Sequence, residues 1–363
     1  MKTYRAVLVG TGGIGEAHVR AVEFTQGRVQ LVAACDINAD RVREFCEKFN
    51  VPTPHTDYAT MLRDEKPDIV LIASPPGMHA DMSIAAMEAG AWALCEKPLC
   101  ASLAEFDRIE ASEKATGQRT ACVFQMRFAS SQTHVRGLLN DGTFGRPLVA
   151  TCNTLWYRDA EYYAVPWRGK WATELGGPTM SQGIHTMDQL LHLFGAWSEV
   201  RAVTDTLYHD IEVEDVSMVH VKFANGARAS ITNSSVCPRQ ETYLRLDCEK
   251  ATIELTHLYA YSQENWKMTP ADPDNSAKIT AAWDKFPETD VGSTHGAQLV
   301  EMVKNRDENT IPLTSGAEAR RTLEFLTAIY KSAFTDTTVI RGSIKAGDPY
   351  YTVLHGGRAN TAQ

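Results

Sequence analysis

The sequence lacks the features that mark membrane and secreted proteins. Its 363 residues contain no apolar run approaching the ~18 residues that a membrane-spanning helix needs. The apolar stretch at residues 6–10 is too short for the hydrophobic region of a signal peptide. There is also no internal repeat and no low-complexity linker. These absences predict a cytoplasmic globular protein with no membrane partner.

The sequence also lacks a basic cluster and a metal or redox pattern of cysteines. The net charge is −9, and acidic and basic residues are spread evenly, so we expect no nucleic-acid partner. None of the eight cysteines forms a C-x-x-C pair, and we expect buried, reduced thiols. At about 150 residues per domain, the length indicates two domains.

The first third of the chain alternates short apolar strands with helical patterns. The segment 68–74 does not alternate apolar with polar residues, which is typical of a strand buried on both faces. Strand and helix in succession predict a parallel, doubly wound α/β sheet. The expected strands are 4–10, 29–35, 68–74, 91–96 and 120–125.

A glycine-rich loop follows the first expected strand. Gly10, Gly12 and Gly15 form a G-x-G-x-x-G pattern that opens a helix, with Gly13 and Ile14 inside it. The first glycine permits the turn, the second lets the backbone approach a pyrophosphate, and the third lets the helix pack on the strand. Free N–H groups at the helix N-terminus bind phosphate. The pattern predicts a dinucleotide site.

Asp36 ends the second expected strand, 21 residues after Gly15, which is where an acid binds the adenosine ribose. A carboxylate there accepts hydrogen bonds from the ribose hydroxyls and repels a 2′-phosphate. Ile37 follows it, and Arg41 and Arg43 lie a turn or more into the next helix. We therefore expect NAD rather than NADP as the cofactor.

The pattern changes after Phe128, where longer strand-like segments predict a mostly antiparallel sheet. The dipeptide Asn225-Gly226 between two of them indicates a hairpin. We predict a dinucleotide-binding Rossmann domain over residues 1–128. An α+β domain for substrate binding and oligomerisation is expected over residues 129–363, with final helices that pack back on the first domain.

A lysine follows the fourth expected strand, in Glu96-Lys97-Pro98. Doubly wound sheets bind ligands at the carboxyl ends of their strands, so Lys97 is expected at the binding crevice. A lysine beside a nicotinamide is able to donate a hydrogen bond to a substrate hydroxyl or to take part in proton transfer. Position alone leaves open a surface lysine with a solvated head.

Four segments together carry a family resemblance. They are the glycine-rich loop, Ser74-Pro75-Pro76-x-x-His79, Glu96-Lys97-Pro98, and Gly176-Gly177 followed by Gly-Ile-His-Thr-Met-Asp at 183–188. In order and spacing they resemble the glucose–fructose oxidoreductase / inositol dehydrogenase (Gfo/Idh/MocA) family, over nearly the whole chain. The resemblance implies a Rossmann domain with an open antiparallel sheet domain, and a tightly bound nicotinamide cofactor. It also implies oxidation or reduction of a carbinol on a sugar or polyol, and a homodimer or homotetramer built through the sheet's outer face.

Residue by residue, the resemblance implies that Lys97 and His185 are catalytic and that a cis bond precedes Pro98. Where the inositol dehydrogenase pattern has an aspartate, this sequence has Ser181, which is unable to share the histidine's proton as a carboxylate does. The run around Ser181 is closer to a branch that includes nucleotide-sugar 3-dehydrogenases and anhydrosugar dehydrogenases. Further cofactor contacts are expected from Ile14, Ile37, Ser74, Pro75, Pro76, His79, Glu96, Lys97 and Gln125.

His185, Asp188 and His192 recur on related faces of an expected helix, a spacing that metal ligands also adopt. No cysteine or further acid has a matching spacing, and the resemblance implies no metal, so we expect none. We expect His185 to face the substrate, since imidazole suits the removal of a hydroxyl proton at neutral pH. A core or surface histidine is the alternative.

An aromatic loop precedes that helix. Residues 156–171 hold six aromatic side chains, which suits stacking on a pyranose while charged groups bind its hydroxyls. The alternative is that these rings anchor the loop to the sheet or to a subunit interface. Arg168 leaves open a carboxylate or phosphate on the substrate. The expected substrate-binding residues are Lys97, Arg127, Arg158, Trp167, Arg168, Ser181 and His185.

We therefore predict an NAD-dependent oxidoreductase that oxidises a secondary hydroxyl of a sugar or polyol by hydride transfer to nicotinamide C4. The branch similarity points to C3 of a pyranose. His185 takes the hydroxyl proton, and Lys97 orients the oxygen. Two alternatives stay open: a glycoside-cleaving enzyme that oxidises C3 transiently to permit elimination, and a non-catalytic NAD-binding regulatory protein.

Overall fold

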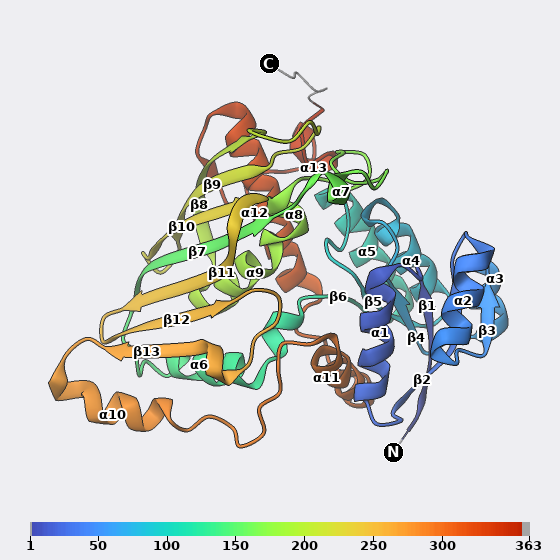
Figure 1. The fold of residues 1–363 in the computed structure, drawn as a ribbon, viewed down its shortest axis with the longest axis horizontal. Coiled ribbons are helices and arrows are strands. Elements are labelled where there is room, and N and C mark those ends of the chain that lie inside the picture. Colours follow the sequence, from blue (N-terminus) through green and yellow to red (C-terminus); the bar gives the residue numbers. More distant parts are fainter. Residues whose placement is uncertain (1, 358–363) are drawn as a thin grey trace. The chain divides into compact units, whose positions relative to one another are not determined.

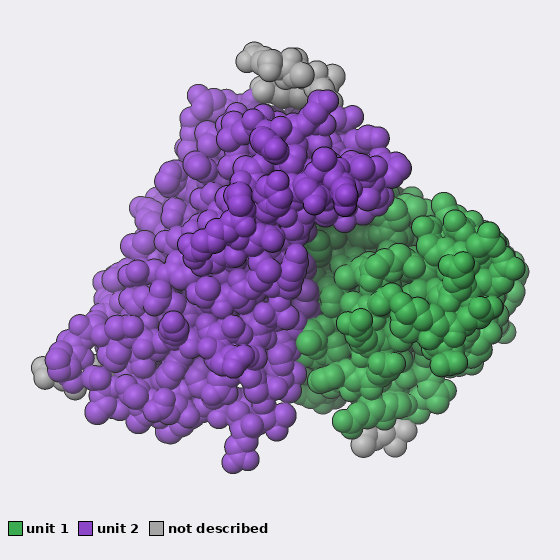
Figure 2. All heavy atoms as spheres, viewed as in Figure 1, with its two compact units in different colours: residues 1–124, 294–320 green, residues 125–293, 321–363 purple. Residues whose placement is uncertain are grey.

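The computed structural model describes residues 2–357, apart from the side chains of residues 274 and 275. It divides the chain into two compact units, coloured green and purple in Figure 2. The first unit comprises residues 1–124 and 294–320, and the second comprises residues 125–293 and 321–363. Within the described residues, no helix has the length and apolar character needed to cross a membrane.

The first unit is built on a six-stranded parallel sheet in the order β3-β2-β1-β4-β5-β6 (Figure 1). Parallel neighbours need a crossover connection, and helices supply it. The predicted doubly wound α/β fold is thus confirmed. The central strands β1, β4 and β5 are buried almost throughout, which explains why their sequences do not alternate. The strands are β1 (Tyr4–Val9), β2 (Val29–Cys35), β3 (Thr53–His55), β4 (Ile69–Ile72), β5 (Trp92–Cys95) and β6 (Thr120–Cys122).

Most helices of the first unit begin at a side chain that caps them. Asn38, Asp57 and Ser102 each accept a hydrogen bond from a backbone N–H of the following first turn. The helix after the glycine-rich loop differs, because its N-cap Gly12 has no side chain to cap it. The helices are α1 (Gly13–Phe24), α2 (Ala39–Phe49), α3 (Tyr58–Glu65), α4 (His79–Glu88), α5 (Leu103–Thr116) and α11 (His295–Glu308).

Helix α11 belongs to the first unit although it lies far along the chain. Leu299, Met302 and Val303 join the hydrophobic cluster that includes the buried side of β1. Gln298, on the same helix, bonds β6 and the segment after it. Its Nε2 donates to the carbonyl of Cys122 (2.7 Å) and its Oε1 accepts from the backbone N–H of Phe124 (3.1 Å). Apolar packing and a satisfied amide together hold α11 in place.

The second unit contains an eight-stranded sheet in the order β13-β12-β11-β7-β10-β9-β8-β14 (Figure 1). Only the β7–β10 pair is parallel, so the predicted mostly antiparallel sheet is confirmed. The hairpin at Asn225-Gly226 joins β9 and β10, and Gly226 has φ +95°. The strands are β7 (Pro147–Tyr157), β8 (Trp197–Asp205), β9 (Val216–Phe223), β10 (Arg228–Ser234), β11 (Val236–Cys248), β12 (Ala251–His257), β13 (Trp266–Pro270) and β14 (Val339–Ile340).

The two faces of this sheet differ. On the covered face, Thr154 of β7 donates to Thr186 of α9 (3.1 Å between hydroxyl oxygens). On the other face Val149, Val203 and Met218 are each at least half exposed. The helices of this unit, with the one that enters it from the first, are α6 (Ser130–Asn140), α7 (Ala160–Tyr163), α8 (Pro178–Ser181), α9 (Gly183–Phe194), α10 (Pro273–Trp283), α12 (Gly316–Thr335) and α13 (Pro349–Thr352).

Several short or peripheral elements were not predicted from sequence, namely β3, α3, α7, α8, β13, α10, β14 and α13. Strand β3 has three residues, too few for a pattern of alternation to emerge. The cysteines form no disulfide; Cys237 is partly exposed and the others are buried, as expected.

The amide of Gln298 gives a stability prediction. Gln298→Leu keeps the volume but removes the hydrogen bonds that the amide forms with the Phe124 N–H and the Cys122 carbonyl. We expect the free energy of unfolding to fall by about 2 kcal/mol, measured by urea denaturation. Val300→Ala, at an exposed position of the same helix, is the control and should change it by less than about 0.5 kcal/mol. Equal losses in both variants would contradict the assignment.

Candidate active site

The glycine-rich loop has the geometry that a dinucleotide site requires. Gly10 has φ +94°, and a Cβ there would collide with the carbonyl of Ala73. A Cβ on Gly15 would lie 2.9 Å from the carbonyl oxygen of Gly10, so the helix packs closely on the loop. By contrast, Gly12 and Gly13 have nothing within 4 Å of such an atom. The fold therefore requires two of these glycines, and the other two leave space beside the uncapped start of α1.

Asp36 lies at the end of β2, where its carboxylate is largely buried. Its Oδ2 accepts from the backbone N–H and the hydroxyl of Thr11, both at 3.0 Å, which ties β2 to the glycine-rich loop. Arg41 reaches back from α2 and donates to both carboxylate oxygens, at 2.6 and 3.1 Å. Burial alone would raise the pKa of Asp36, but the hydrogen bonds from Arg41, Asn38 and Thr11 leave it lowered. Arg41 was not among the predicted site residues, although it lies only five positions after Asp36.

The Ser74–Pro76 loop follows β4, where the sequence predicts a cofactor contact. Pro75 is exposed and Ser74 partly buried. His79, which opens α4, is almost fully buried instead. Its Nδ1 lies 2.7 Å from the carbonyl oxygen of Pro98 and its Nε2 lies 2.8 Å from that of Ser74. His79 thus links two loops from the interior of the unit. Two further predicted cofactor contacts, Ile14 and Ile37, are exposed.

Lys97 follows β5 at the carboxyl end of the parallel sheet and is partly buried. The Lys97–Pro98 peptide bond is cis, as the resemblance implies. Glu96 before it is 6% exposed, and the backbone N–H of Lys97 donates to its Oε2 (3.3 Å). The lysine therefore projects from a buried segment, which differs from a lysine on a solvated loop.

In the second unit, α9 carries His185 in its first turn, where the ring is partly exposed. One turn further, Asp188 is completely buried. It accepts from Nε and Nη2 of Arg127 at 2.7 and 2.6 Å, and from the hydroxyl of Thr322 at 2.7 Å. Asp188 thus anchors α9 to the segment before α6 and to α12.

Arg127 corrects one expectation of the sequence analysis. It was predicted as a substrate contact, but it is 2% exposed and forms the bidentate pair with Asp188. A guanidinium removed from water needs an opposite charge, and Asp188 provides it while accepting from Nε and Nη2. Gln125, predicted as a cofactor contact, begins the 3₁₀ turn η2 (Gln125–Phe128) and belongs to the second unit.

The candidate metal triad on α9 is not assembled for a metal. The oxygens of Asp188 are occupied by Arg127 and Thr322. Burial lowers the pKa of His192 to about 2, together with the positive charges of Arg127, Arg136 and Arg321, which also disfavour a cation at this place. Among the described residues, the group whose ligand atoms lie close enough for a metal is a different one, His18, Glu96 and His295, in the first unit.

The aromatic loop divides between the two roles considered for it. Three of its rings are anchors: Trp156 Nε1 donates to Thr242 (2.9 Å), Tyr163 to Ser235 (3.0 Å), and Trp171 Nε1 to the carbonyl of Glu212 (2.9 Å). These bonds hold the loop on the sheet. The loop in turn positions its other three rings, Tyr157, Tyr162 and Trp167.

The remaining part of the loop forms a cation–aromatic cluster. The guanidinium of Arg168 lies over the rings of Tyr162 (3.8 Å) and Trp167 (4.3 Å) and pairs with buried Glu174 (2.9 Å). Arg158 lies 5.1 Å from the Tyr162 ring. The charge of Arg168 is therefore compensated within the protein, which weakens the case for an anionic substrate bound there.

Gln182 connects this cluster to the start of α9. Its Nε2 donates to the hydroxyl of Tyr162 (3.0 Å), and its Oε1 accepts from Ser181 (2.8 Å). Ser181 was predicted as a substrate contact, whereas Gln182 and Tyr162, although they lie in the run and the loop considered above, were given no site role. The signal was present in the Ser181-Gln182 run and in the paired tyrosines, but spacing alone does not show that they meet.

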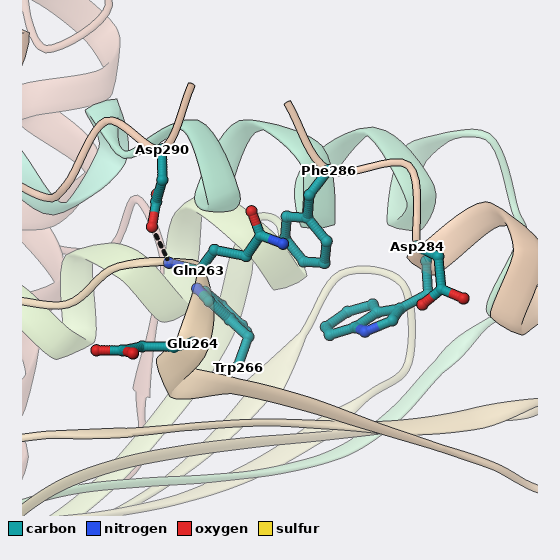
Figure 3. Close-up of a pocket in the computed structure, with 7 residues that line it drawn as sticks. Gln263, Glu264, Trp266, Asp284, Phe286 and Asp290 are labelled. Atoms are coloured by element: carbon teal, nitrogen blue, oxygen red, sulfur yellow. Dashed lines mark hydrogen bonds between the residues drawn. The ribbon is translucent and has the colours of Figure 1, made fainter. Parts of the chain in front are cut away.

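A separate pocket of about 400 Å³ lies at the edge of the second unit, beside β13 and α10. Its lining includes Trp266, Trp283 and Phe286, and the backbone N–H of Gln263 donates to Asp290 at its margin (Figure 3). None of the predicted site residues lines it. The rings of Trp283 and Phe286 pack edge to face against each other, with centroids 4.9 Å apart.

The Arg127–Asp188 pair gives a prediction for the structure that carries His185. Arg127→Met leaves the buried carboxylate of Asp188 without its charged partner, so we expect the free energy of unfolding to fall by about 3 kcal/mol or more. Arg146→Met, which breaks the exposed pair with Glu249, should cost less than about 1 kcal/mol. Chemical denaturation measures both. A cost for Arg127→Met no larger than that of Arg146→Met would refute the anchoring role.

Comparison with known proteins identifies both units. Residues 4–124 match the family described as "Oxidoreductase family, NAD-binding Rossmann fold". Residues 133–254 match "GFO/IDH/MocA C-terminal domain". Together the two matches cover more than half of the chain.

Several relatives and solved structures are similar to this chain over nearly its full length. The chain is 25% identical to D-apiose dehydrogenase of Paraburkholderia graminis, over 98% of this chain and 95% of that protein. It is 23% identical to D-glucoside 3-dehydrogenase of Escherichia coli, over 92% and 97%. The WlbA dehydrogenase of Bordetella pertussis, solved with NADH and UDP-GlcNAcA, aligns with a TM-score of 0.82 and 27% identity, over 93% and 99%. The chain therefore belongs to the Gfo/Idh/MocA family of oxidoreductases, and its first unit is an NAD-binding Rossmann fold.

Proposed function

We propose that this protein is an NAD-dependent dehydrogenase that oxidises a secondary hydroxyl of a sugar or polyol, with Lys97 and His185 as its catalytic residues. The observation that carries the proposal is the place of Lys97. It follows β5 at the ligand-binding end of an NAD-binding sheet, on a segment held by interior hydrogen bonds from His79 and to Glu96. The dehydrogenases among the relatives support the same reaction class.

The residues present fit the cofactor. Space beside Gly12 and Gly13 adjoins the uncapped N-terminus of α1, which suits a pyrophosphate. Asp36 follows β2, where an acid binds the adenosine ribose, and the ribose hydroxyls would replace Arg41 as donors to its carboxylate. Bound NAD supplies the acceptor for the hydride that leaves the carbinol carbon. The protein's own task is then to orient the hydroxyl and to remove its proton.

Lys97 and His185 divide that task. Lys97 donates a hydrogen bond to the hydroxyl oxygen and stabilises the negative charge that grows on it. His185 accepts the hydroxyl proton, so the products are a ketone, NADH and an imidazolium that releases its proton to water. Ser181, Arg158, Trp167 and Arg168 are proposed to bind the sugar. Tyr162 joins them, because Gln182 holds its hydroxyl next to the segment that leads to His185.

C3 of a pyranose is the proposed position of oxidation. The similarity to a D-glucoside 3-dehydrogenase favours it. Transient oxidation at C3 followed by elimination is the second candidate, and it predicts sugar cleavage without net NADH. An NAD-binding regulatory protein is the third candidate. The hydrogen bonds that fix the segment of Lys97 argue against it, because such a protein has no need of a positioned lysine.

We further propose a cytoplasmic homodimer or homotetramer. The support for self-association is the uncovered face of the second sheet, where Val149, Val203 and Met218 are exposed. A subunit interface across that face would bury them.

The catalytic assignment predicts a specific kinetic result. Lys97→Ala and His185→Ala should each lower kcat by about 100-fold or more, because each removes a group that acts on the reacting oxygen. NAD affinity, measured by calorimetry, should change less than about threefold in His185→Ala. Lys304→Ala, on an exposed part of α11, is the control. Full turnover in either catalytic variant would refute the assignment.

The Asp36–Arg41 pair predicts how cofactor choice changes. Asp36→Ala removes the carboxylate that binds ribose and repels a 2′-phosphate, and it releases Arg41 to bind one. We expect KM for NAD to rise about tenfold and the NAD-to-NADP ratio of kcat/KM to fall by more. Asp40→Ala, which breaks only the exposed pair with Arg43, should leave the ratio unchanged. An unchanged ratio in Asp36→Ala would contradict this role.

A further inference from the structure

A buried carboxylate adjoins Lys97 in the first unit, and three segments donate to it. Oε1 of Glu96 accepts from Nε2 of His295 at 2.8 Å and from Nε2 of His18 at 3.2 Å. Its Oε2 accepts from the backbone N–H of Lys97 at 3.3 Å. His18 lies on α1, one turn beyond Gly15, and His295 opens α11. Glu96 thus joins the helix of the glycine-rich loop, the strand end that carries Lys97, and a distant helix.

The charge state of this cluster follows from its surroundings. Burial favours the neutral form of Glu96, but the hydrogen bonds from His18 and His295 outweigh it and hold the pKa of Glu96 well below its usual range. Burial also lowers the pKa of His18, so its ring is neutral and donates from Nε2. The other titratable groups that face Glu96 are Lys97 next to it, His79 on α4 and Cys95 on β5. An ionised carboxylate is therefore fixed beside the lysine.

We propose that His295 is a positioning residue for Lys97, acting through Glu96. The proposal rests on the proposed function, in which Lys97 acts on the substrate. His295 donates the shorter of the two imidazole bonds, and it comes from a helix held in the unit by Gln298 and its apolar neighbours. It fixes the carboxylate that holds the Lys97 backbone, and thereby the place and electrostatic environment of the ammonium group. A residue outside every sequence motif is in this way part of the catalytic apparatus.

The same three side chains also satisfy the distance criterion for a metal site, since their ligand atoms lie within 4.8 Å of one another. Hydrogen bonding accounts for them more simply. Both nitrogen–oxygen distances fit an N–H···O bond to a carboxylate, and a buried carboxylate requires such donors. Metal content is therefore measured as part of the test.

A second histidine–glutamate pair in the first unit supplies a matched control. Nε2 of His55 lies 3.3 Å from Oε1 of Glu65, and both side chains are partly buried. His55 is on β3, at the opposite edge of the sheet from β5 and β6. Its contact with Asp36 is through its backbone carbonyl, which a side-chain substitution retains. Its loss therefore reports the effect of breaking such a pair without the effect on Lys97.

The experiment measures kcat against pH for the wild type, His295→Leu, His295→Gln and His55→Leu. His295→Leu should lower kcat about tenfold at neutral pH, with less than about a twofold change in KM for NAD. It removes a donor from Glu96 and so raises the pKa of that carboxyl. Glu96 then takes up its proton as the pH falls through the raised pKa. The variant should therefore lose kcat on the acidic side in a second step, in addition to the step that protonation of His185 causes. His295→Gln keeps an N–H donor and should recover most of the lost kcat and the wild-type limb. His55→Leu should leave the profile unchanged.

Several outcomes would overturn the inference. They are a wild-type pH profile in His295→Leu, an equal defect in His295→Gln, the same second step in His55→Leu, or one equivalent of tightly bound metal by elemental analysis. Circular dichroism confirms folding. If His295→Leu does not fold, Glu96→Gln replaces it, and it should lower kcat with no acidic limb from position 96. An inactive Lys97→Ala with a normal His295→Leu refutes this inference alone, whereas a fully active Lys97→Ala refutes the proposed function.

Discussion

A buried carboxylate must be surrounded by donors, and in each unit one such group fixes the segment that carries a candidate catalytic residue. Glu96 does so for Lys97, with donors from α1 and α11. Asp188 does so for His185, one turn away on α9, with donors from Arg127 and Thr322. The cost of an unpaired charge in the interior is several kcal/mol, so these contacts determine which segments meet. Helix propensity, which depends on neighbouring residues only, does not determine which distant segments pack together.

Hydrogen bonds to buried groups, together with close backbone packing, also fix the loops at the carboxyl ends of the parallel strands. The glycine-rich loop is fixed from two sides, by Thr11 on Asp36 and by the packing of Gly15 against the backbone of Gly10. The loop after β5 is fixed by His79 and Glu96. What stays open is the space beside Gly12 and the start of α1. In the proposed function this space receives the pyrophosphate, and the fixed loops around it hold the cofactor in one orientation.

The features that could be predicted from the sequence are those that depend on residues close together in the chain. The turn at Gly10, the acid at the end of β2 and the lysine after β5 lie within short motifs, and the structure places each at the expected point of the sheet. Long-range partners were beyond it. Arg127 was assigned to substrate because nothing in its neighbourhood shows that it faces Asp188, 61 residues later. His295 was missed for the same reason, since its partner lies 199 residues earlier.

The central claim is that this protein moves a hydride from a sugar or polyol carbinol to NAD. The most direct measurement follows NADH absorbance while the wild-type protein is mixed with NAD and a panel of hexoses, glycosides, anhydrosugars, inositols and sugar acids. The product of any reacting sugar is then analysed for a new carbonyl group. The account predicts NADH and a ketone in equal amounts from at least one member of the panel. Cleavage of a glycoside without net NADH, or no NADH from any sugar, would contradict it.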